Sequence, residues 1–103
     1  MVVKLDQGVW TLTSDTSGTA WRHSGGLIHY SVLVSSGTGT LAMQISYDQG
    51  TTWTAITDAS HTSTVQKNMK GIPPGVLIRP NLSGSASTPI FIVKAYSVDQ
   101  LQG

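Results

Sequence analysis

The stretch LIHYSVLVSSGTGTLAMQISYDQGTTW, residues 27–53, indicates the fold most clearly, because apolar and polar residues alternate along it in two runs. The first run places four residues on one face: Ile28, Tyr30, Val32 and Val34. The second run does the same with Leu41, Met43, Ile45 and Tyr47. A period of two is that of a β-strand with one face in a core. The stretch therefore predicts two half-buried strands, separated by a turn at SSGTG, residues 35–39.

Outside this stretch, turn residues recur about every ten residues, a spacing typical of β-sandwiches and barrels. Further strands are predicted at residues 8–12, 19–22, 53–58, 62–69, 76–84 and 89–98. We expect the polar run 62–69 at a sheet edge and the apolar run 89–98 at the centre. Pro80 places its strand at an edge or a bulge. No connection is long enough for a helical crossover, so the strands pair antiparallel. The predicted fold is an all-β antiparallel sandwich, jelly-roll or immunoglobulin-like, of seven or eight short strands.

The composition fits one domain over residues 1–103, with residues 1–7 and 99–103 as possible arms that reach a neighbour. Charged residues make up 11% of the chain, far below the roughly 25% of ordinary soluble domains. The six basic residues are scattered, which argues against nucleic acid as a partner. There is no cysteine for a disulfide or a thiolate metal site, and no apolar run long enough to cross a membrane. We expect a soluble chain with no signal peptide, made in the cytoplasm.

The run SYDQGTTW, residues 46–53, resembles the Asp-box hairpin of sialidases and other β-proteins. Its matching residues are Ser46, Asp48, Gly50, Thr52 and Trp53. An Asp at this place accepts hydrogen bonds from backbone N–H groups, a Gly takes the positive φ of the reversal, and a Trp covers the base of the hairpin. We interpret the five residues as structural anchors. Sialidases carry several such boxes and an arginine triad, whereas this chain has one box and two arginines.

No catalytic, cofactor or metal site is predicted. The three histidines, His23, His29 and His61, lack the close spacing of metal ligands and have no Cys or Glu beside them. No G-x-S-x-G motif supports a serine nucleophile. An alternative use of the aromatic residues is a platform on which sugars stack, formed by Trp10, Trp21, Tyr30 and Tyr47.

Several strands carry apolar residues on both faces, with Leu33 beside Val32, Leu77 beside Val76 and Ile92 beside Phe91. A monomeric two-layer sandwich would expose one residue of each pair. We therefore predict that Leu33, Leu77 and Ile92 lie in contacts between subunits of a homotrimer or homodimer.

The whole pattern resembles the small β-sandwich proteins of tailed-bacteriophage particles. The resemblance extends from HYSVLVSSGTGTLAMQISYDQGTTWTAI through GVLIRPNLSG to IFIVKAYSV. It implies a non-enzymatic capsid decoration (cement) protein on the virion surface, with the major capsid protein and further copies of itself as partners. The alternatives are a tail or head-fibre adhesin component and a carbohydrate-binding module with a glycan ligand.

Overall fold

The computed structural model describes residues 2–23, 27–69 and 72–101, and the side chains of residues 7–23, 27–69 and 72–97. This part of the chain forms strands and no helix. The strands are β1 (Val2–Leu12), β2 (Thr16–Ser17), β3 (Trp21–Arg22), β4 (Leu27–Ser46), β5 (Thr54–His61), β6 (Val65–Met69) and β7 (Leu77–Leu101). All their pairings are antiparallel. The predicted all-β antiparallel class is confirmed.

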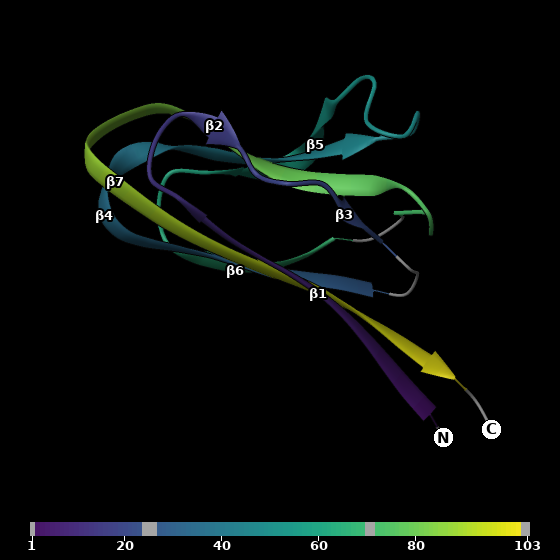
Figure 1. Ribbon diagram of the computed structural model, residues 1–103. Helices are drawn as coiled ribbons and strands as arrows, with labels where there is room; N and C mark the ends of the chain where they lie inside the picture. The colour runs from purple at the N-terminus through teal and green to yellow at the C-terminus, as the bar shows by residue number, and fades with distance from the viewer. Residues whose placement is uncertain (1, 24–26, 70–71, 102–103) are drawn as a thin grey trace.

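The frame of the molecule is the pairing of β4 with β7, which runs from Leu27 opposite Val98 to Ser46 opposite Leu77. Both strands bend near their midpoints, so the sheet folds over on itself into two layers (Figure 1). We call layer A the half that contains β1, β6, residues 27–34 of β4 and residues 90–101 of β7. Layer B contains β2, β3, β5, residues 40–46 of β4 and residues 77–83 of β7.

The bend explains why the predicted short strands are halves of long ones. The pairing of β4 with β7 shifts register three times between Val34 and Thr40, and so continues through the predicted turn at residues 35–39. Gly37 lies there with φ 73°, and a Cβ atom on it would come 2.6 Å from the Cα of Pro89. The close approach of two backbones therefore requires glycine at this position. The expectation of uniformly short strands was wrong, because both strands bend at the same place and stay hydrogen-bonded.

The core fills the space between the layers and follows the predicted alternation. From β4, layer A contributes Ile28, Tyr30 and Val32, and layer B contributes Leu41, Met43 and Ile45, all buried. Val34 is half-buried and packs against this cluster. Tyr47 was assigned to the same face, but β4 ends at Ser46 and the Tyr47 side chain is 69% exposed.

The sequence also predicted an edge strand at residues 62–69, a central strand at residues 89–98, and an edge or bulge at Pro80. In the described part of the chain β6 pairs with β4 alone and β7 lies between β1 and β4, so the edge and central assignments are confirmed. Pro80 is buried and sits opposite Met43 of β4, away from a free edge. Its carbonyl oxygen accepts from the Gly18 N–H at 2.8 Å. In an antiparallel ladder the N–H and the C=O of one residue point toward the same neighbouring strand. The side of Pro80 that lacks an N–H therefore faces Gly18, between β2 and β3, so no hydrogen bond between β7 and β4 is lost.

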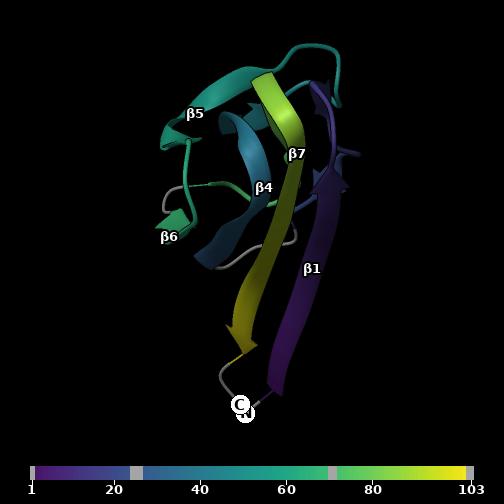
Figure 2. The same ribbon diagram turned by 90° about the vertical axis from the view of Figure 1, so that its left-hand side faces the viewer.

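The ends of the chain run side by side. Residues 2–6 of β1 pair with residues 97–101 of β7, and residues 2–4 and 99–101 continue past the start of β4 as a two-stranded ribbon (Figures 1 and 2). The predicted arms, residues 1–7 and 99–103, were expected to lie outside the strands. Where the structure describes them, they are paired strands, of which residues 2–4 and 99–101 project beyond β4; residues 1, 102 and 103 lie outside the described part.

Candidate functional site

The outer face of layer A is a grid of side chains set by the strand register. Reading across β1, β7, β4 and β6, the first row is Gln7, Tyr96, His29 and Asn68, and the second is Val9, Lys94, Ser31 and Gln66. A third row places Thr11, Ile92 and Leu33 side by side. This face holds most of the large apolar side chains that the structure leaves exposed, with Val9 at 55%, Leu33 at 47% and Tyr96 at 40%.

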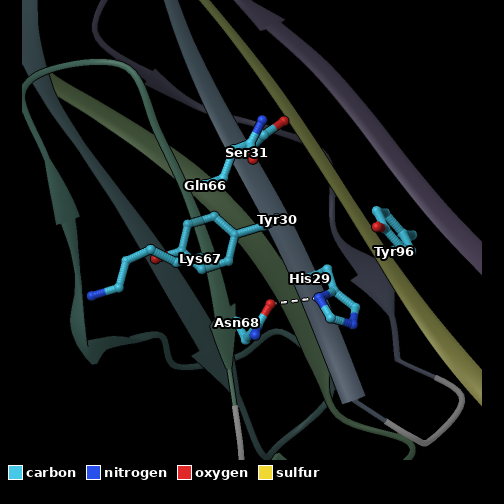
Figure 3. Close-up of a pocket in the computed structure, with 7 residues that line it drawn as sticks. All are labelled: His29, Tyr30, Ser31, Gln66, Lys67, Asn68 and Tyr96. Carbon is cyan, nitrogen blue, oxygen red and sulfur yellow. Dashed lines mark hydrogen bonds between the residues drawn. The ribbon is translucent and has the colours of Figure 1, made fainter.

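One end of this face is an aromatic groove, which we define by His29, Ser31, Gln66, Asn68 and Tyr96 (Figure 3). Tyr30 and Lys67 complete its lining, and its volume is about 410 Å³. The rings of His29 and Tyr96 stack with centroids 5.3 Å apart and planes at 26°. Nδ1 of His29 donates a hydrogen bond to Oδ1 of Asn68. Three side chains from three strands thus hold one another in place.

The other end is an apolar hollow of about 290 Å³, which we define by Leu33, Thr64, Val65 and Ile92. The two hollows share Ser31 and Gln66 and so form one continuous surface. Leu33 and Ile92 are direct cross-strand partners, so the structure brings together two of the three predicted contact residues.

Leu77, the third predicted contact residue, lies apart from the other two. It is half-buried in layer B, where it pairs with Ser46 and Arg22. The structure does not bring it to the surface that Leu33 and Ile92 share.

The five residues of SYDQGTTW meet in the turn between β4 and β5. Oδ1 of Asp48 accepts from the Ser46 hydroxyl and from the Thr52 N–H, both at 2.8 Å, and Oδ2 accepts from the Thr52 hydroxyl at 2.6 Å. These bonds, those from Thr52 first, lower the pKa of Asp48 to about 2. Gly50 has φ 92° and accepts from the Trp53 indole N–H at 3.1 Å.

The Trp53 ring joins this turn to the outer face of layer B. The Arg79 guanidinium lies 4.1 Å from the centre of the ring, and its Nε donates to Oε1 of Gln44. The described polar contacts of the turn are internal to the hairpin or join it to other strands of layer B, as when Arg22 of β3 donates to Oε1 of Gln49 at 2.6 Å. These contacts stabilise the turn between β4 and β5, and we call the five residues of the motif the turn lock.

The four aromatic residues considered as a sugar platform do not share a surface. Trp10 and Tyr30 are buried in the core, and Trp21 packs edge-on against Trp10 with centroids 6.5 Å apart. Tyr47 is exposed beyond the end of β4 in layer B. The predicted sugar platform of these four residues is therefore wrong, because a domain this small needs most of its large aromatic rings in the core.

The histidines are spread through the fold. His23 is buried beside Trp21, with ring centroids 6.0 Å apart, and His29 lies in the aromatic groove. Nε2 of His61 and the Tyr30 hydroxyl are 2.6 Å apart, which links the two layers. Burial, and secondly the charge of Lys67, lowers the pKa of His61, while burial raises the pKa of Tyr30. Among the described residues, no three His, Cys, Asp or Glu side chains gather to hold a metal ion.

Sequence reasoning missed the pairing of His29 with Tyr96 and Asn68. The alternation of residues 27–34 already placed His29 on the outer face of its strand. What it lacked was the register that sets His29 opposite Tyr96 on β7 and Asn68 on β6.

No protein-family model matches the chain, and no curated protein matches it. The described residues contain no helix of a length and hydropathy that would cross a membrane.

Proposed function

We propose that the protein is a structural component of a tailed-bacteriophage particle: a capsid decoration (cement) protein that works as a homo-oligomer and performs no catalysis. The resemblance in sequence pattern motivates this proposal. The observation that supports it most is the apolar surface on layer A, where Leu33 and Ile92 pair directly and Val9 lies diagonally beside Ile92.

This surface suits contact between copies of the chain. A cross-strand pair and a diagonal neighbour form one continuous patch, and Lys94 is the one charged residue in its rows. Burying such a patch removes apolar area from water without stripping many ions of their hydration. In the third row, Thr11 supplies a polar group for a rim.

The terminal ribbon suits a second contact, with the capsid shell or with a neighbouring subunit. Residues 2–6 pair on one side with β7, and in the described part of the chain no strand pairs with the other side of β1. The backbone N–H and C=O groups on that side can accept a further strand, which is a common way for one protein to extend another's sheet.

The carboxylates of the described side chains support a non-catalytic role, because they do not converge. Asp15 accepts from the Ser85 N–H at 2.9 Å, Asp48 closes its own turn, and Asp58 lies in β5. None of the three lines the aromatic groove or the apolar hollow.

The test is the mass of the purified protein in solution and its binding to capsids that lack it. We expect a trimer or dimer by light scattering, and co-sedimentation with the bare capsids. Leu33→Asp places a carboxylate in the patch and should give a monomer, whereas Tyr47→Ala, which removes an exposed ring from layer B, should leave the mass unchanged. A wild-type protein that is monomeric and ignores capsids contradicts the proposal.

A tail or head-fibre component is the alternative within the same class of particle. Such a part occurs in a few to a dozen copies, while a capsid cement occurs in hundreds. The number of copies per particle therefore separates the two.

A further inference from the structure

We propose that the aromatic groove of layer A binds a neutral carbohydrate. This site goes beyond the proposed function, because neither contact between subunits nor contact with a capsid requires it. The groove lies at the end of the face away from Leu33, at His29, which precedes Leu33 by four residues in β4.

The first part of the argument is a rigid aromatic surface. Tyr96 is 40% exposed, and its ring stacks on the imidazole of His29. His29 is itself fixed by its hydrogen bond to Asn68 across the β4–β6 pair. A sugar ring presents an apolar face of C–H groups, which packs on an aromatic ring of this kind. Since Tyr96 is already held in place, little side-chain entropy is lost when a ligand binds.

The second part is the set of polar groups around that surface. Ser31, Gln66 and Asn68 line the groove beside the stacked rings (Figure 3). A carboxamide both donates and accepts, and a hydroxyl does the same. Asn68 uses its oxygen for His29, and its NH₂ group is not part of that bond and can donate to a ligand. These are the groups that match the paired hydroxyls of a saccharide, whose oxygens donate and accept in turn.

The third part is charge and size. The residues that line the groove include one Lys, Lys67, and no Arg, Asp or Glu. A phosphate or nucleic-acid ligand would require several basic residues, and an acidic sugar would at least favour them. The volume of about 410 Å³ lies within the range of small-ligand sites. A neutral saccharide of one or two rings is the ligand class that fits these properties together.

The test is an NMR titration of the ¹⁵N-labelled full chain with glucose, galactose, N-acetylglucosamine, rhamnose and their common disaccharides. We expect at least one of them to shift the amide signals of His29, Gln66, Asn68 and Tyr96, with a Kd on the order of 1 mM. Tyr96→Ala should weaken that binding about tenfold or more, and Asn68→Ala, at the edge strand, provides a second variant should Tyr96→Ala fail to fold. Tyr47→Ala, a tyrosine outside the groove, is the matched control and should bind as the wild type does.

Three outcomes would overturn the site: no shift with any saccharide well above that Kd, shifts confined to residues outside the groove, or equal weakening by Tyr96→Ala and Tyr47→Ala. The Leu33→Asp variant keeps the two proposals separate. It should lose self-association while the saccharide still shifts His29 and Tyr96, so either proposal can fail without the other.

Discussion

Val32 and Leu33 are neighbours in β4, and replacing each with alanine should affect stability in an unexpected order. The smaller truncation, at Val32, should lower the free energy of unfolding more than the larger one, at Leu33. Val32 is 1% exposed and faces the core, whereas Leu33 is 47% exposed on the outer face of layer A. Val32→Ala removes two buried carbons, worth about 0.8 kcal/mol each, and the cavity adds about 1 kcal/mol, so the loss is about 2–3 kcal/mol. For a chain of this length that lowers the Tm by about 10 °C or more.

Leu33→Ala deletes one carbon more than Val32→Ala does, yet it should lower the free energy of unfolding less. Three carbons at about 0.8 kcal/mol, of which roughly half are already in water, give about 1 kcal/mol, and no cavity forms at a surface site. The assay is urea unfolding of both variants at a protein concentration low enough for the expected oligomer to dissociate, with the free energy of unfolding extrapolated linearly to water. If Leu33→Ala cost as much as Val32→Ala, the two faces of β4 would be assigned wrongly and with them the apolar surface of layer A.

Two further predictions concern the bend and the turn lock. Gly37→Ala should lower the free energy of unfolding, measured in urea, by about 1–3 kcal/mol more than Gly84→Ala does. Both glycines have positive φ, but of the two only Gly37 would bring the new Cβ within 3 Å of backbone atoms. Equal losses for the two variants would show that the bend has room to adjust. The pKa of Asp48, about 2 in the folded chain, lies below its unfolded value of about 3.9, so its carboxylate stabilises the fold above about pH 4 and that contribution is lost as the pH falls toward 2. Thermal unfolding of Asp48→Asn between pH 6 and pH 2 should show a smaller fall than the wild type, with Thr52→Val between them, and an unchanged fall would exclude Asp48 as its source.

The alternation of residues 27–34 and 40–46 was sufficient to predict which side chains of β4 face the core, because a strand with one buried face fixes that choice locally. The bend was not predictable in the same way. A Ser- and Gly-rich segment such as residues 35–39 has the same composition in a hairpin turn as in a strand that folds over. The outcome depends on whether the distant partner, near Pro89, bends at the same place.

The candidate site depends on the same kind of non-local information. Composition and alternation placed Leu33 and Ile92 outside the core, and the structure shows them paired. The stack of His29 on Tyr96 required the register between two strands that lie far apart in the sequence. The pairing of the two chain ends, expected as arms, was missed for the same reason, since each end supplies half of the ribbon.

We propose that this sandwich serves as a repeated part of a larger shell. The most direct test is the number of its copies in purified particles, measured by quantitative mass spectrometry against the major capsid protein. We expect hundreds of copies per particle. A dozen copies or fewer, or particles without the protein, would contradict it.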